Sequence, residues 1–385
     1  MRDATPSISS SGRLALMAGH CAGMLDLVAL PLWVGSLIAA YGLGPQQAGG
    51  VVTLFLMGVV LASVGTAPLL GRLAPRVSVP LGFAVSGGML LACAELRALQ
   101  PLAAMHFVAG LGTGLALSTV HGTMGRSPNP HRLFGQAFAA MGVFGMLFLL
   151  TTGWATERLG TAMLFRLFGG VQFVAALIAV LAFPRGAWAA PLVSSSGSHK
   201  ARMPAAVWFG IGGIVCMTLV QAMTFSFAER IGLARGLTPN QVIRVLSIVG
   251  ILNIGAAVLA TLAQRRIGAR TVLLAGPVLQ SLLAATIAFA APAWAYVAAM
   301  LLFVAMLIVT HTFVFGLLAR LDPSGRATAA TPAMTMLGSA IGPILAGTMV
   351  KVAGFGALGA LAVVVGIVAL ACLRQLVRRA STPRT

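Results

Sequence analysis

Asp26 is the residue whose type and position most clearly suggest chemistry. The chain has only six Asp and Glu residues, and this one lies near the middle of a long apolar run. A charged side chain at a helix centre in a bilayer costs about 2.5–3.5 kcal/mol on insertion scales. Low dielectric favours the neutral carboxyl, which could therefore exchange a proton near neutral pH. The alternative is a neutral carboxyl that bonds helices together, since Gly19 and Gly23 share its helical face.

Several other polar side chains lie in apolar runs. The further candidates for proton coupling or for a substrate cavity are His106, His121, His311, Gln221 and Asn253. Histidine titrates near physiological pH, so it can relay protons or bond a substrate. A buried structural histidine is the alternative at each position. His20 points about 120° away from Asp26 on one helix, so we expect no direct pair between them.

An acidic and a basic residue, Glu229 and Arg230, follow directly after a long apolar run. We expect this pair to form an outer gate or to contact a substrate. The alternative is a purely interfacial pair, because the ends of membrane-spanning helices tolerate charged side chains that reach toward water.

The composition excludes a water-soluble protein. The sequence of 385 residues is 59% hydrophobic and 8% charged, whereas soluble domains carry about 25% charged residues. Runs of about 20 apolar residues span the ~30 Å hydrocarbon core as helices. The net charge of +19 does not indicate a nucleic-acid partner, because the basic residues lie in short loops between apolar runs. We therefore predict an all-α integral membrane protein, with the lipid bilayer as its solvent.

Enzyme signatures are absent from the sequence. Neither a G-x-x-x-x-G-K-[ST] loop nor an H-E-x-x-H motif occurs, and the six histidines are scattered over different segments. The cysteines lie in apolar segments without a CxxC pair. We predict no catalytic residues, no metal site and no cofactor. A membrane-embedded enzyme is the alternative from another functional class.

The apolar runs predict twelve spans, an even number that places both termini on the same side. We place them near 14–37, 50–70, 77–97, 101–124, 135–155, 162–183, 205–228, 243–262, 271–291, 294–318, 329–350 and 357–376. With both termini inside, 18 of the 25 basic residues fall on the cytoplasmic side. This is the positive-inside pattern, and it predicts a multi-pass protein of the bacterial inner membrane.

A polar stretch divides the spans into two sets of six. We expect an N-terminal six-helix bundle at 1–183, a cytoplasmic linker at 184–203 and a C-terminal six-helix bundle at 204–385. Residues of the same type recur 194 positions apart, as in the pairs Arg126 and Arg320, Gly153 and Gly347, and Gly160 and Gly354. This offset favours a parallel repeat, the arrangement in which transporters bind substrate between their halves.

Two loops carry a family resemblance that extends over essentially the whole chain. Residues 67–76 read APLLGRLAPR and residues 262–270 read LAQRRIGAR. Both resemble the signature G-x-L-A-D-R-x-G-R-R of the major facilitator superfamily. The resemblance implies cytoplasmic gate loops that contain Arg72, Arg76, Arg265, Arg266 and Arg270. The acidic residue of the signature is replaced by Gly71 and Gln264, so the ionic latch that it forms in the family is in doubt. The segment 106–114 also resembles a family motif, with His106 in place of its arginine.

The resemblance implies a function as well as a fold. It implies secondary active transport of a small molecule by alternating access in a monomer. Helices 1, 4, 7 and 10 line the cavity in the family, and Asp26, His121 and His311 lie on three of them. Proton coupling through Asp26 is the first hypothesis, and a gradient-independent facilitator of the same fold is the alternative. Residues 142–145 lack the Gly-Pro signature of family antiporters, which leans toward uptake.

Overall fold

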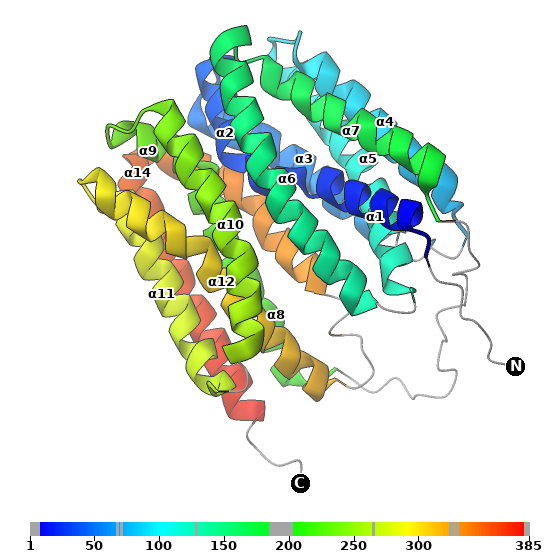
Figure 1. The fold of residues 1–385 in the computed structure, drawn as a ribbon. Coiled ribbons are helices and arrows are strands. Elements are labelled where there is room, and N and C mark those ends of the chain that lie inside the picture. The colour runs from blue at the N-terminus through cyan, green and yellow to red at the C-terminus, as the bar shows by residue number, and fades with distance from the viewer. Residues whose placement is uncertain are drawn as a thin grey trace, which may run out of the picture. The chain divides into compact units, whose positions relative to one another are not determined.

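All regular structure in the described part of the chain is helical. The computed structural model describes residues 8–66, 69, 72–127, 130–184, 203–263, 266–322, 327 and 331–380. The helices are α1 (Ser10–Gly23), α2 (Leu25–Ala39), α3 (Pro45–Thr66), α4 (Pro75–Cys93), α5 (Leu99–Gly125), α6 (Pro130–Leu159), α7 (Met163–Ala182), α8 (Ala205–Ser226), α9 (Ala228–Ala234), α10 (Pro239–Ala263), α11 (Ala269–Phe289), α12 (Ala293–Leu321) and α14 (Thr331–Ala380) (Figure 1). This confirms the predicted all-α membrane fold. The expected linker at 184–203 lies almost entirely outside the described residues.

The described helices account for the twelve predicted spans once α14 is divided. Eleven segments are long and apolar enough to cross a membrane, and the last of them, Met334–Ala380, has 47 residues. A straight helix of that length would measure about 70 Å, more than twice the hydrocarbon core. Helical geometry is lost at Ala353 and Gly354, where Gly354 has φ +71°. The two last predicted spans therefore lie on either side of this turn.

The first predicted span, 14–37, is interrupted. Met24 leaves helical geometry with φ −109° and ψ 15°, and the chain restarts as α2 at Leu25. The N–H of Leu27 donates to the carbonyl of Met24, an i to i+3 bond that tightens the chain at this point. Asp26 consequently lies in the first turn of a new helix. The seventh span ends in a similar way at Phe227, after which α9 begins.

The chain forms two compact units. Unit 1 comprises residues 1–29 and 54–200, and so contains α1, most of α3, and α4 to α7. In this unit α4 packs on α5 and α7, and α1 packs on α5, α6 and α7. Its apolar core includes Leu16 of α1, Phe83 of α4 and Val120 of α5.

Unit 2 comprises residues 30–53 and 201–385. It contains α8 to α12 and α14, together with most of α2 and the start of α3. Here α14 packs on α8 and α11, and α12 packs on α10 and α11. Its core includes Ile214 of α8, Val314 of α12 and Leu373 of α14. The predicted division at the linker and these contact-based units differ in the placement of residues 30–53.

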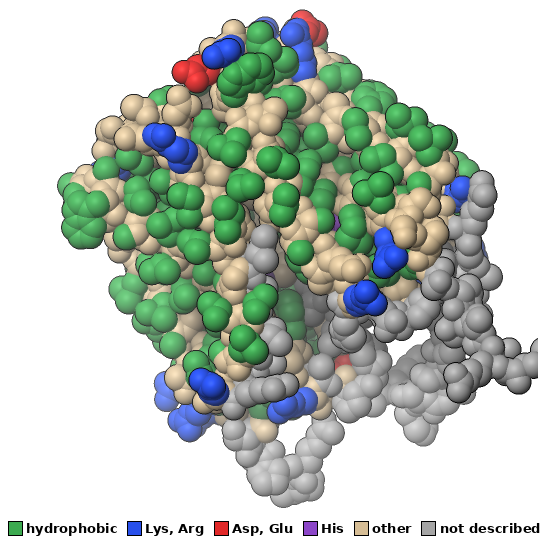
Figure 2. Space-filling model, in the orientation of Figure 1, with side chains coloured by type: hydrophobic (Ala, Val, Ile, Leu, Met, Phe, Trp, Pro, Cys, Tyr) green, Lys and Arg blue, Asp and Glu red, His purple; other side chains and the backbone are tan. Residues whose placement is uncertain are grey.

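The outer faces of the helices are apolar, as a bilayer requires. Many Leu, Val and Phe side chains are exposed, among them Val64, Leu181, Leu259 and Val352. Hydrophobic side chains are spread over the face drawn in Figure 2, with groups of Lys and Arg side chains between and beyond them. Buried groups that can form hydrogen bonds are therefore the exception, and they define the candidate site.

Candidate functional site

Asp26 is buried in unit 1, with 8% of its surface exposed. Its carboxylate is held close to the backbone N–H groups of Asp26 and Leu27, at the start of α2. No side chain among the described residues forms an ion pair or a hydrogen bond with it. The interruption at Met24 thus creates a carboxyl that is enclosed by protein and is stabilised by the backbone alone. Such a group can take up or release a proton without breaking a side-chain bond.

A glutamine from α7 supports the interrupted helix. A helical carbonyl at position 22 normally accepts from the N–H of residue 26, and the break at Met24 disturbs that pairing. Gln172 donates from its Nε2 to the carbonyl oxygen of Ala22 at 3.0 Å. The amide oxygen Oε1 of Gln172 is buried without a partner. Gln172 was not among the residues predicted from the sequence, although a lone amide inside an apolar run was a visible signal.

The structure brings His121 together with His20 rather than with Asp26. Nδ1 of His20 on α1 and Nε2 of His121 on α5 are 3.0 Å apart. The close pairing follows from the packing of α1 on α5, in which Gly19 meets Val120 and Gly23 meets Leu117.

His106 has structural partners. It is fully buried, its Nδ1 donates to the carbonyl oxygen of Leu102 at 2.7 Å, and the sulfur of Cys93 lies 3.4 Å from the same nitrogen. Phe165 packs edge-on against the ring. These contacts join α5 to α4 and α7, so the geometry favours the structural alternative for His106.

Unit 2 contains buried polar atoms that lack partners. Nε2 of His311 and Oδ1 of Asn253 are both buried without a hydrogen bond. The ring of His311 stacks on Phe315, with 5.1 Å between centroids. Gln221 accepts a long hydrogen bond of 3.5 Å from Gln280. Buried polar atoms are nearly always satisfied, so the free atoms of His311 and Asn253 are available to a bound molecule.

Glu229 is enclosed at the end of the seventh span. Its Oε2 is buried without a partner and lies against Gly35 of α2, where any side chain would collide with it. Burial raises the pKa of Glu229 to about 7, and the charge of Arg230 opposes this rise. Tyr296 of α12 donates to the neighbouring carbonyl oxygen of Ala228 at 2.7 Å. This carboxyl can therefore change charge near neutral pH.

Two glycines allow α3 and α14 to touch through their backbones. A Cβ added at Gly49 would lie 2.7 Å from the carbonyl carbon of Pro343, and one at Gly347 would lie 2.8 Å from that of Pro45. Helices that span membranes commonly approach closely through such small residues. Beside this contact, Nζ of Lys351 donates to Oε1 of Gln46 at 3.0 Å. The start of α3 thus packs against α14 within unit 2 and is hydrogen-bonded to it.

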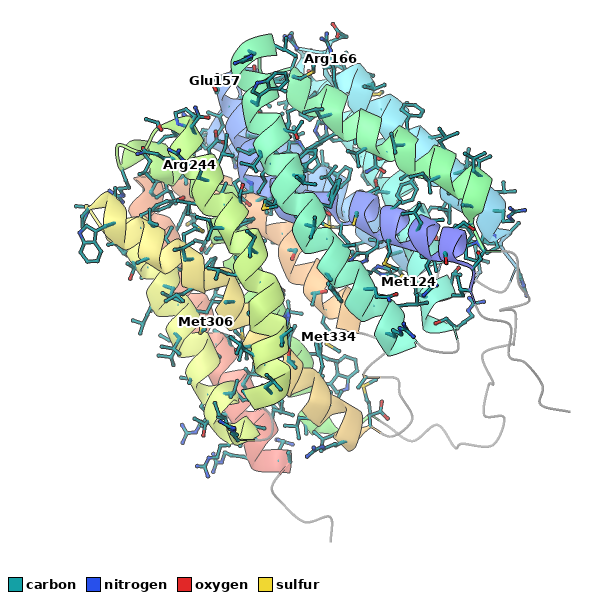
Figure 3. The ribbon with its side chains drawn as sticks, in the orientation of Figure 1. Met124, Glu157, Arg166, Arg244, Met306 and Met334 are labelled. Carbon is teal, nitrogen blue, oxygen red and sulfur yellow. The ribbon has the colours of Figure 1, made fainter. Side chains whose placement is uncertain are left out.

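The arginines of the predicted gate loops lie at the surface. Arg72, Arg76, Arg266 and Arg270 are exposed, and Arg265 lies outside the described residues. Another exposed pair closes the opposite end of unit 1, where Nη2 of Arg166 lies 2.8 Å from Oε1 of Glu95. The hydrogen bond and charge of Arg166 lower the pKa of Glu95. In Figure 3 Glu157 and Arg166 lie at one end of unit 1, and Met124 lies toward the end where α1 begins.

No group of three or more His, Cys, Asp or Glu side chains within the described segments is placed to hold a metal ion. The candidate groups in unit 1 are one enclosed carboxyl and a histidine pair, and those in unit 2 are a second carboxyl and several buried polar atoms without partners. None of these arrangements supplies a nucleophile with an adjacent base. These described groups can bind protons and form hydrogen bonds with a solute.

Comparison with known proteins gives a family and a fold. The family model described as Major Facilitator Superfamily matches residues 15–331. The 4-hydroxybenzoate transporter PcaK of Acinetobacter baylyi is 26% identical over 112 residues, which are 29% of this chain and 22% of that protein. The chain therefore matches about a fifth of the length of this curated relative.

Solved structures resemble the chain over almost its full length. The nucleoside transporter NupG superposes with a TM-score of 0.77 at 12% identity, covering 95% of this chain and 99% of that one. A D-xylose-proton symporter gives 0.74 at 16% identity, with 93% and 96% covered. The inward-open xylose transporter XylE from E. coli gives 0.73 at 15% identity, with 92% and 94% covered. At these identities the likeness establishes the fold alone.

Proposed function

Since the chain belongs to the Major Facilitator Superfamily, whose members are transporters and not enzymes, we propose that it couples the movement of a small molecule across the membrane to the movement of protons. Asp26 is the proton-binding group. Transport proceeds by alternating access between two six-helix halves joined by the linker at 184–203. The protein works as a monomer in the bacterial inner membrane, with both termini in the cytoplasm.

The observation that carries this proposal is the enclosure of Asp26. The side chain is 8% exposed, and it has no side-chain partner among the described residues. A permanently charged group at such a position is energetically costly in a bilayer. A carboxyl that alternates between its neutral and charged forms can instead bind and release the transported proton there. The fold is compatible with this role, since one structural neighbour is a D-xylose-proton symporter.

The substrate contacts are assigned to unit 2. The unpartnered atoms of Asn253 and His311 provide an acceptor and a ring nitrogen, and Gln221 provides a weakly held amide. These groups suit an uncharged or weakly acidic molecule that carries hydroxyl groups. The relatives and structural neighbours transport 4-hydroxybenzoate, nucleosides and D-xylose, which all carry hydroxyl groups and form the first panel to test.

The ends of the helices supply the gates. Glu229 against Gly35, and the α3–α14 contact at Gly49 and Gly347, form the outer gate in its closed arrangement. Arg230 follows Glu229 in the chain, and its positive charge favours the ionised form of the Glu229 carboxyl. On the cytoplasmic side the exposed arginines Arg72, Arg76, Arg266 and Arg270, with Arg265, form the gate loops. Without the acidic residue of the family signature, we expect these arginines to bond helix-end carbonyls in the closed gate instead.

The decisive experiment compares Asp26→Asn with the parent protein in proteoliposomes. An inward proton gradient is imposed, and accumulation of 4-hydroxybenzoate, D-xylose and a pyrimidine nucleoside is followed together with internal pH. We expect the parent to accumulate one compound with proton entry. Asp26→Asn should abolish accumulation while partly retaining exchange of the compound, because exchange does not require net proton movement. Glu95→Gln, which removes an exposed carboxyl, is the matched control.

Unchanged accumulation by a well-folded Asp26→Asn protein would remove the coupling role from Asp26. Flux of a compound without proton movement in the parent would instead identify a facilitator of the same fold, with Asp26 as a structural carboxyl. Activity that depends on an added metal ion and converts the compound chemically would revive the enzyme alternative.

A further inference from the structure

Unit 1 contains a histidine pair that the proposed mechanism does not yet use, and we propose that His20 and His121 form a shared-proton site that relays protons between Asp26 and the cytoplasmic side. The proposal rests on the proposed function, because it assigns a route to the proton that Asp26 binds. The pair itself is a feature of α1 and α5 that can be tested without any substrate.

The geometry is that of a direct N–H···N hydrogen bond. The nitrogens are 3.0 Å apart, and the ring planes are tilted by 34° with centroids 5.2 Å apart. Two neutral imidazoles carry one N–H each, so one ring donates and the other accepts. Nε2 of His20 is then left as the only buried ring nitrogen of the pair without a partner. Leaving a buried polar atom without a partner is unfavourable, so a purely structural pair would be expected to avoid it.

The surroundings of the two rings contain no fixed counterion. Phe138 packs edge-on against His20, and Phe134 against His121, both from α6. Cys21 on α1 and Gln172 on α7 are uncharged, and Arg132 on α6 is exposed. Within the described part of the chain no carboxylate lies within ion-pair distance of either ring. Among these residues no fixed negative charge holds a proton on the pair, so the proton can be passed on.

The pair extends from the interior of unit 1 toward its surface. His20 is fully buried, whereas His121 is partly exposed. His121 lies near the end of α5 that meets the beginning of α1, which is the predicted cytoplasmic end. Asp26 follows His20 by six residues, with the interruption at Met24 between them. The proposed relay crosses this separation through water-mediated hydrogen bonds. The unpartnered nitrogen of His20 is the inner end of the pair.

The relay step is balanced in protons. In the resting pair each ring carries its proton on Nδ1, so that His20 donates to Nε2 of His121. A proton that leaves the Asp26 carboxyl binds at Nε2 of His20, and the Nδ1 proton of His20 passes to His121. His121 then releases its own Nδ1 proton to water. The pair is neutral before and after the step, and it resets when both rings exchange tautomer.

The first test uses only protons and the purified full-length protein. Nitrogen-15 NMR of labelled histidines, with assignments from His20→Gln and His121→Gln, should reveal the N–H···N pair. A single titration step should move the signals of both rings together. Proton-binding titrations should show that each single variant and the double variant lose the same one proton. His106→Gln is the matched control for a buried histidine with structural partners.

Two rings that stay neutral and independent between pH 5 and pH 9 would overturn the proposal. So would joint binding of added Zn²⁺ by both rings in the absence of a shared proton, because the pair would then be a metal site. These outcomes do not depend on transport, so they are distinguishable from a failure of the proposed function.

The second test addresses the relay. With the panel compound that the parent accumulates, His121→Ala should lower the rate of proton-driven accumulation by roughly 100-fold, the scale of a lost proton-transfer group. Exchange without a gradient should be unaffected, and added imidazole should restore part of the rate. Unchanged accumulation, or a loss that imidazole does not restore, would show that the shared proton lies off the transport route.

Discussion

The first helix of each half is interrupted, and in both cases an acidic residue follows the interruption by two positions. In unit 1 the break at Met24 precedes Asp26, and in unit 2 the break at Phe227 precedes Glu229. The first break lies within a predicted span, and the second lies at the end of one. The two interruptions are therefore similar, and they differ in where along the span the acidic residue lies. Asp26 is enclosed within unit 1, whereas Glu229 lies against Gly35 of α2 within unit 2.

The two units also support their first helices differently. Gln172 of α7 bonds the carbonyl of Ala22 in unit 1, and Gln280 of α11 bonds the carbonyl of Met217 in unit 2, each at 3.0 Å. Ala22 and Met217 occupy nearly equivalent places in the repeat, but the two glutamines do not. The residue 194 positions after Gln172 is Gly366, which packs on Ser281. In each unit a glutamine thus donates to a carbonyl of the first helix, but the glutamine comes from a non-equivalent helix.

The turns, by contrast, are repeated closely. Gly42 and Gly236 are 194 positions apart, as are Gly160 and Gly354, and all four have positive φ. A positive φ is strained for residues with a side chain, and glycine adopts it freely. The repeat therefore retains the backbone turns, while the polar groups are placed independently in each half. This independence is why we assign the proton to unit 1 and the substrate contacts to unit 2.

The largest expected effect separates gating from coupling. Gly49→Ala forces a Cβ into the backbone of Pro343, so α3 and α14 must move apart. We expect labelling of a Thr53→Cys reporter by an impermeant maleimide to speed up roughly tenfold, a shift of about 1.4 kcal/mol in the closed population. Thr53 is a suitable reporter because its Oγ1 bonds the N–H of Ile344 at 3.1 Å. The four native cysteines are replaced beforehand.

Gly50→Ala is the control for this change. A Cβ at Gly50 would meet only the flexible tip of Ile344 at 3.7 Å, so labelling should match that of the parent. Equal labelling rates in Gly49→Ala and Gly50→Ala would show that the glycine contact does not hold the outer end closed.

The sequence predicted the parts of this comparison that depend on composition and periodicity. The apolar runs were sufficient for the all-α membrane fold, and the single acid within the first run was sufficient to select Asp26. The pair of Gly160 and Gly354 was visible as a repeat, although their shared φ was not. The interruption at Met24 was missed, because no proline or polar cluster marks it.

Contacts between distant helices could not be predicted. The pairing of His20 with His121 depends on the antiparallel register of α1 and α5, which Gly19 and Gly23 set by meeting Val120 and Leu117. Likewise, the packing of Glu229 on Gly35 involves helices far apart in the sequence. Such contacts require knowledge of which helices touch, and one sequence does not contain it.

An effect on stability rather than on gating sharpens the comparison of the two glutamines. Gln172→Leu should destabilise the protein by about 1–3 kcal/mol, because the carbonyl of Ala22 beside the break loses its donor. Gln280→Leu should cost less, because Met217 lies within the uninterrupted helix α8, which supplies its carbonyl with a helical donor. Thermal unfolding of the purified variants in detergent measures both. Equal losses of stability in the two variants would show that the break at Met24 does not make the hydrogen bond from Gln172 more important than the one from Gln280.

The smallest expected effect is a change in pH dependence at Glu229. Its pKa is raised to about 7 by burial against α2, whereas a hydrated glutamate titrates near 4.3. The packed arrangement therefore binds a proton more tightly than an open one. Packing is favoured at low pH and weakens as pH rises from about 4.3 through 7. Labelling of the Thr53→Cys reporter, divided at each pH by the labelling rate of the unfolded protein to remove the titration of the thiol itself, should accordingly speed up severalfold between pH 5 and pH 8.5.

Glu229→Gln should remove this pH dependence, because the amide remains neutral throughout the range. The exposed acid Glu157 provides the control, and Glu157→Gln should leave the profile intact. Asp26→Asn should also leave it intact, although we expect it to abolish accumulation, because we propose separate roles, with Asp26 as the proton-binding group and Glu229 as part of the outer gate. If Asp26→Asn flattened the profile as well, the two acids would titrate as one system, and the separation between the units would have to be abandoned.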